Sequence, residues 1–276
     1  MDLNTARAAI NAGTLAGSLT WVATLIYLVA FAPLVWRLRQ PRSRPPALID
    51  HLPVALGFLV HLVAVVLRGI DLKRLPLGNL QEACAFLALL LAASYLVAAA
   101  RGRFAILQIA ILGLVTVFMF VSSIVPRDLV RLQARDLRGR WFAFHTLSSL
   151  LGFTALVLTC VLSLIYLWEE RELKHKRLRN YLRFLPSLES CDNIGYRLLT
   201  LGFPLFTVGI VTGMFWSSRA PGWSWGFKET MAVVAWAVYA FLVHNRVIGG
   251  VRGRRAALLA VTGSIIALAA VLAIPT

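Results

Sequence analysis

The apolar stretch "FHTLSSLLGFTALVLTCVLSLIYLW" (144–168) decides the class of fold. It contains no Asp, Glu, Lys or Arg, and a helix needs about 20 mainly apolar residues to cross the hydrocarbon core of a bilayer. Its Leu, Val and Ala residues suit a helix, because a strand of a membrane barrel would alternate polar and apolar side chains. The stretch therefore predicts a transmembrane helix.

Seven further segments share this composition. With the first, the predicted spans are residues 14–36, 50–68, 79–100, 104–125, 141–168, 196–217, 229–248 and 255–274. The remaining residues leave no room for a soluble domain. We predict an all-α fold, a polytopic membrane helix bundle of about eight transmembrane helices. Residues 1–276 would form a single transmembrane domain, multi-pass in the cell inner (plasma) membrane.

The composition supports lipid as the main solvent. Hydrophobic residues make up 59% of the chain and charged residues only 14%, a balance that would expose too much apolar surface to water. The 28 Lys and Arg residues against 12 Asp and Glu give a formal charge of +16. These bases cluster in short segments between apolar runs, as membrane topology favours. Membrane lipid is thus the expected partner, and nucleic acid is not.

Loop charge also predicts an orientation. If the basic connection at 37–44 is cytoplasmic, that side carries more Lys and Arg than the other, in line with the positive-inside rule. Both termini and the stretch "WSWGFKET" (223–230) then lie outside. The external segment 126–140 mixes arginines with leucines. It is either a short amphipathic helix on the outer surface or an irregular charged loop.

Three histidines at or within the spans are candidate site residues. His61 lies among apolar neighbours in "GFLVHLVAVVLR", and is either a ligand for haem iron or another metal, or a structural histidine bonded to a neighbouring helix. His145 begins the fifth span and His244 ends the seventh. Each of these two is either a ligand or an ordinary interfacial residue.

Polar residues surround the outer end of the second and third spans. Arg68 is seven residues after His61, on the same helical face and about 10 Å nearer the outside. In "GNLQEACAFLALLL" (78–91), Glu82 enters the third span with Asn79 and Gln81. A carboxylate in this position needs a partner, and we expect it to pair with Arg68. A haem propionate would compete for the same arginine.

The stretch "WSWGFKET" places two tryptophans, a lysine and a glutamate between two spans. Tryptophans at a membrane interface commonly form an aromatic belt. Flat indoles beside a lysine also suit a large planar ligand with carboxylates, such as haem.

Four blocks of the chain resemble the cytochrome c assembly family of tryptophan-rich haem-handling membrane proteins, especially its short HemX-like and CcsA-like branch. They begin at "FHTLSSLLGF", "LPSLESCDNI", "WSWGFKETMA" and "GGVRGRRAAL". The resemblance implies that Trp223, Trp225, Lys228 and Glu229 belong to an external loop that holds haem. It implies that His145 is an external axial ligand, that His244 ends the next span, and that His61 is the second-span histidine.

The resemblance implies haem b as cofactor, and apocytochrome or other assembly subunits as partners. Counting 1.5 Å per residue puts His61 and His145 about one helical turn apart in depth, and His61 and His244 about two. We therefore predict that His61 and His145 share the haem iron beneath Trp223 and Trp225. His244 would belong to an inner site with His51 or serve a structural role.

Two other functions compete with haem handling in cytochrome c assembly. The family's Trp-Asp-Pro-Lys-Glu reads "WGFKE" here, and no histidine follows the last span. Both departures favour a membrane regulator or accessory subunit that has lost haem transfer. A transporter would show broken helices in inverted repeats, and no repeat is evident. No catalytic triad, phosphate loop or paired carboxylates indicate a classical enzyme.

Overall fold

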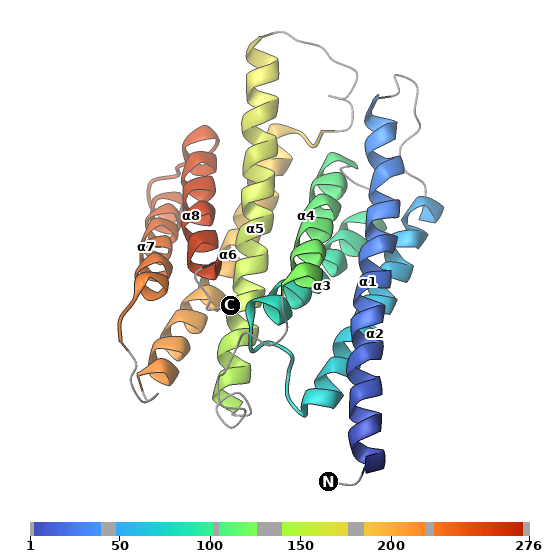
Figure 1. The fold of residues 1–276 in the computed structure, drawn as a ribbon. Coiled ribbons are helices and arrows are strands. Elements are labelled where there is room, and N and C mark those ends of the chain that lie inside the picture. Colours follow the sequence, from blue (N-terminus) through green and yellow to red (C-terminus); the bar gives the residue numbers. More distant parts are fainter. Residues whose placement is uncertain are drawn as a thin grey trace. The chain divides into compact units, whose positions relative to one another are not determined.

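The computed structural model describes residues 3–39, 48–101, 105–125, 140–175, 185–218 and 224–272, and these are mainly helical. The elements are α1 (Leu3–Arg39), η1 (Leu48–His51), α2 (Leu52–Leu72), α3 (Leu80–Ala100), α4 (Ala105–Ile124), α5 (Arg140–Lys174), α6 (Leu188–Ser217), α7 (Phe227–Val247) and α8 (Arg254–Leu272) (Figure 1). Eight of the described helices are long and apolar enough to cross a membrane. The predicted all-α class and eight spans are confirmed, and the orientation of the termini stays a prediction.

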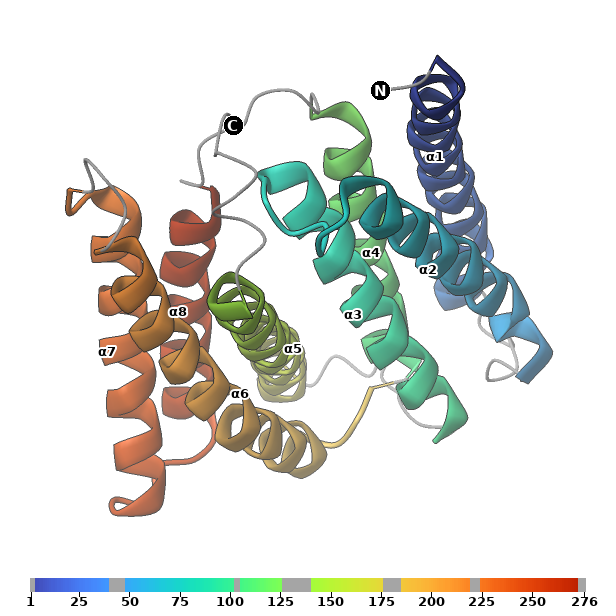
Figure 2. The same ribbon diagram turned by 90° about the horizontal axis from the view of Figure 1, so that it is seen from below.

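The described helices form two compact units, one within residues 1–138 and one within 139–274. In the first unit, α1 packs on α2 and α4, while α3 packs on α4 and α2, which closes a ring of four helices (Figure 2). Glycine permits the contact between α1 and α2, since a Cβ on Gly57 would lie 3.0 Å from the ring of Tyr27. The prediction of a single domain over 1–276 stays a prediction.

The second unit is another ring of four helices. The longest contact is between α5 and α6, and α7 packs on α6 and α8, while α8 returns to α5. Backbone approaches backbone where α5 meets α6: a Cβ on Gly152 would lie 2.5 Å from the Phe206 nitrogen, and one on Gly202 would lie 2.7 Å from the Cβ of Ala155. Such small-residue contacts are a common basis of helix association in lipid, where no hydrophobic effect drives it.

Two helices begin well before the predicted spans: α1 begins at Leu3 rather than at residue 14, and α6 begins at Leu188. For α6, the predicted span began at 196, which left Cys191 in a polar connection, but the helix begins at Leu188 and Cys191 is buried within it. The helix includes Asp192 because that carboxylate is paired: Arg246 on α7 donates to it at 3.0 and 2.7 Å, and the Gly253 N–H donates at 3.2 Å. A compensating charge 54 residues away therefore extends the helix past its apolar core.

Candidate functional site

His61 is completely buried within the first unit, at 0% exposure on α2. The Tyr27 ring of α1 packs edge-on against the imidazole, with ring centroids 6.0 Å apart. The ring also faces the backbone of Ala85 on α3 without reaching hydrogen-bond geometry. Neither ring nitrogen has a hydrogen-bond partner among the described residues. An imidazole in this state has a lone pair available for a metal.

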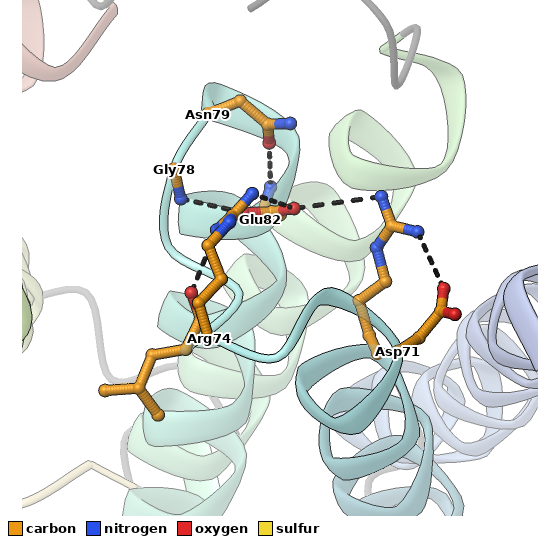
Figure 3. Close-up of polar contacts among 7 residues, drawn as sticks. Asp71, Arg74, Gly78, Asn79 and Glu82 are labelled. Carbon is orange, nitrogen blue, oxygen red and sulfur yellow. Dashed lines mark hydrogen bonds and ion pairs between the residues drawn. The ribbon is translucent and has the colours of Figure 1, made fainter. Parts of the chain in front are cut away.

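Glu82 is the centre of a charged cluster at the N-terminal end of α3 (Figure 3). Its carboxylate accepts hydrogen bonds from Arg74 at 2.8 and 3.2 Å and from the Gly78 N–H at 2.7 Å. The expected ion pair with Arg68 is confirmed, but at 3.8 Å, and Arg68 also lies 3.6 Å from Asp71. Arg74, which the sequence analysis did not single out, is thus the closer partner of Glu82.

The turn after α2 explains how Arg74 reaches Glu82. Lys73 adopts a left-handed conformation with φ of 51°, and its N–H donates to the Ile70 carbonyl while that of Arg74 donates to Gly69. This pair of bonds is a Schellman motif, which ends a helix and reverses the chain. On the other side of the turn, the Asn79 side chain caps α3 by accepting from the Glu82 N–H at 2.7 Å.

His145 lies in the second unit, where α5 meets α6. Its Nδ1 is 2.7 Å from the carbonyl oxygen of Gly209. A carbonyl only accepts hydrogen bonds, so Nδ1 carries the proton and the lone pair of the neutral ring is on Nε2. A histidine that donates Nδ1–H to a backbone carbonyl is a common arrangement of metal ligands.

A row of glycines on α6 seats this ring. A Cβ on Gly213 would overlap the imidazole of His145, and one on Gly209 would overlap the side chain of Ser149. Gly195, Gly202, Gly209 and Gly213 are spaced by seven, seven and four residues, which places them on one helical face. The row was not predicted from the sequence, although its spacing is visible there.

The stretch "WSWGFKET" is described from Ser224 onward, so Trp223 lies outside the described residues, as do residues 126–139. Gly226 precedes α7, and the Glu229 carboxylate accepts from its N–H at 3.1 Å. Lys228 and Glu229 therefore belong to the first turn of a helix. Trp225 is 53% exposed, and its indole N–H donates to Thr230 at 2.8 Å. Lys228 is exposed, with its charge close enough to act on His145.

The other two histidines lie at helix ends. His244 is exposed near the C-terminal end of α7, the end opposite Lys228. His51 ends η1 in the first unit and is buried, with its Nδ1 2.8 Å from the hydroxyl of Tyr95.

The structure thus brings some predicted residues together. His145 and Lys228 both belong to the second unit, where the Lys228 charge acts on His145, and His244 is at the opposite end of α7 from Lys228. His61 and Arg68 share α2 in the first unit. The shared iron between His61 and His145, and the inner site of His51 and His244, each join residues of different units and stay predictions.

Comparison with known proteins gives the family. The model of the family described as "Cytochrome C assembly protein" matches residues 77–274. The chain belongs to this family. The matched region includes His145, Trp225, Lys228 and His244, and it begins after His61 and Arg68. With eight candidate spans, the chain is a multi-pass membrane protein.

Relatives named "Cytochrome c biogenesis protein CcsA" match most of the chain. The protein of Parasynechococcus marenigrum (strain WH8102) is 32% identical over 88% of each chain. That of Synechococcus sp. (strain RCC307) is 30% identical over 87% of this chain and 88% of the relative. The protein of Cyanophora paradoxa is 26% identical over 75% and 79%.

Proposed function

We propose that this membrane protein binds haem b and handles it during cytochrome c assembly, towards the external face of the membrane. The observation that carries the proposal is the state of His61. A buried polar group without a hydrogen bond costs about 1–3 kcal/mol, and both nitrogens of this buried ring lack a partner among the described residues. A ligand that accepts the imidazole lone pair would offset that cost.

In this proposal, His145 would be the haem ligand that the second unit supplies. Its hydrogen bond to Gly209 and its seat against Gly213 hold the ring in one orientation, with the lone pair on Nε2. Haem b would supply an iron that accepts imidazole lone pairs. It also carries two negatively charged propionates. Lys228 and Arg68 are the cations near these histidines along their own units and would pair with propionates, while Trp225 and Trp223 would cover the macrocycle. External apocytochrome and other assembly subunits would receive or position the haem.

The absorption spectrum of the protein purified in detergent tests this function. A Soret band with sharp reduced α and β bands is expected. His61→Ala and His145→Ala should each convert a six-coordinate spectrum to a five-coordinate one, and added imidazole should restore it. His175→Ala, at an exposed position directly after the end of α5, is the matched control and should change nothing. If His244→Ala removes the ligand and His145→Ala does not, the proposed pairing is wrong.

One observation favours the second candidate function, a regulator or accessory subunit that does not transfer haem. The polar groups at the start of α7 bond to one another: Glu229 caps Gly226, and the Trp225 indole donates to Thr230, whose hydroxyl donates to the Gly226 carbonyl at 2.9 Å. A loop stabilised in this way needs no haem to order it. Absence of a Soret band after haem reconstitution would favour this function.

A further inference from the structure

A small cavity lies among the four helices of the first unit, with a volume of about 40 Å³. Every helix of that unit contributes to its wall. The lining includes Thr20 of α1, Arg68 of α2, Gln81 and Glu82 of α3, and Ser122 of α4. Ala64 and Ala85 complete the side nearest to His61. The polar part of this wall is unusual for the interior of a membrane bundle, where ionisable groups mark functional paths.

Two polar atoms in this wall have no partner in the part of the chain that the structure describes. Ser122 is 1% exposed and its hydroxyl makes no hydrogen bond, and the side-chain oxygen of Gln81 is likewise buried and unpaired. The hydroxyl of Thr20 donates to the Ala16 carbonyl at 2.8 Å, which leaves its oxygen able to accept. Buried polar groups in native proteins are nearly always bonded to protein or to ordered water.

Arg68, at one end of the cavity, also indicates bound water. Arg68 lies 3.6 Å from Asp71 and 3.8 Å from Glu82, and both distances exceed that of a direct hydrogen bond. A polar contact across such a gap commonly holds a bridging water. The Arg68 side chain is 25% exposed, so the cavity is open to the surface on its side.

We propose that this cavity is a hydrated vestibule, a binding site for a small cluster of water molecules that reaches from Arg68 to within one helical turn of His61. The volume of about 40 Å³ holds about three waters, since one water needs at least about 10–15 Å³. The four charged side chains Arg68, Asp71, Arg74 and Glu82 sum to zero, which suits a neutral ligand. The unpaired Ser122 and Gln81 oxygens accept hydrogen bonds from the waters, and the Arg68 N–H groups donate to them.

Radiolytic hydroxyl-radical footprinting of the full-length protein tests the vestibule, because the radicals form from water at the labelled side chain. Pro76 lines the cavity and is buried, while the adjacent Leu77 is also buried and does not line it. After correction for intrinsic reactivity, Pro76 should be oxidised several-fold faster than Leu77. Ser122→Val, which fills the cavity and removes the acceptor, should abolish the difference.

The adjacent serine supplies the control. Ser123 donates to the Met119 carbonyl at 2.8 Å, has its hydroxyl 3.1 Å from that of Thr24, and does not line the cavity. Ser123→Val removes these bonds without changing the cavity wall, so it should leave Pro76 oxidation unchanged. Equal oxidation of Pro76 and Leu77 in the unmodified protein, or fast oxidation that persists in Ser122→Val, would overturn the proposal. If Ser122→Val does not fold, Ala64→Val fills the same cavity from α2 and gives the same two outcomes.

A stability measurement gives an independent answer. If the Ser122 hydroxyl is bonded to water, Ser122→Ala lowers the free energy of unfolding; if the hydroxyl is dry and unpaired, the same change raises it and the vestibule is refuted. None of these measurements uses haem. A protein with no Soret band but with fast Pro76 oxidation would therefore refute the proposed function and leave the vestibule standing.

Discussion

The ion pairs of Glu82 predict that the loss of Arg74 lowers the stability of the protein more than the loss of Arg68. The Glu82 side chain is 4% exposed and that of Arg74 is 11% exposed, with 2.8 Å between them. Removing one member of a buried, hydrogen-bonded pair costs about 3–5 kcal/mol, because the other charge is left uncompensated. Arg74→Leu should therefore lower the free energy of unfolding by about 3–5 kcal/mol. This corresponds to a factor of at least about 100 in the unfolding equilibrium.

Arg68→Leu is the matched comparison, because it removes the same side chain from the same carboxylate. The Arg68 contact is 3.8 Å long and its side chain is 25% exposed, so the expected loss is about 1 kcal/mol or less, as for a solvated pair. The double change Glu82→Leu with Arg74→Leu should cost less than Arg74→Leu alone, since it leaves no unpaired charge.

The assay is reversible unfolding of the purified protein in mixed micelles, followed by circular dichroism and tryptophan fluorescence. These variants, the single change Glu82→Leu and the unmodified protein are measured under identical conditions, and the coupling energy between Glu82 and Arg74 follows from the double-mutant cycle. The reasoning fails if Arg68→Leu is as damaging as Arg74→Leu, or if the double variant is less stable than Arg74→Leu alone.

Four further outcomes are expected. Gly213→Ala should displace the His145 ring and weaken any spectral signature that depends on it, as read from the coordination state of bound haem. Asp192→Asn should lower the free energy of unfolding by up to about 3 kcal/mol, because it leaves the half-buried Arg246 without its carboxylate. Gly202→Val should destabilise the α5–α6 contact by about 1–3 kcal/mol through overpacking. For orientation, alkaline phosphatase fused to the C-terminus should be active, and a fusion in the basic segment after α5 inactive, with the opposite result reversing the topology.

The spans were predictable because length and hydropathy alone identify a membrane helix, and seven of the eight began within a few residues of the expected position. The exception, α6, shows the limit of that signal. Asp192 and its neighbours look like a loop in sequence, and the arginine that neutralises the carboxylate comes from α7. A local pattern does not contain a partner that far along the chain.

The lack of a local sequence signal for distant or turn-dependent contacts also explains why Arg74 was not predicted as the partner of Glu82. The sequence predicted Arg68 as the partner of Glu82 because it is the nearest cation in the predicted topology. That contact exists, but the left-handed turn at Lys73 brings Arg74 closer. Lysine is an uncommon residue at a positive φ, so the turn has no clear signal. The start of α7 did have one: a glutamate three residues after Gly226 is the pattern of a helix N-terminus, and it shows why Lys228 and Glu229 are helical rather than part of an extended loop.

The buried and half-buried polar groups of the two units differ in whether the protein itself supplies a partner. Asp192 is paired with Arg246, Glu82 with Arg74, and His145 Nδ1 with Gly209, so each of these groups fixes a position. His61, together with Ser122, is buried without a partner among the described residues. Selection for stability alone would replace such groups with apolar side chains of similar size, at little cost or with a gain. Ser122 lies on the cavity wall, and His61 lies one helical turn along α2 from the lining residue Ala64. Their presence there supports the two proposals: water bound at Ser122, and an electron-pair acceptor bound at His61.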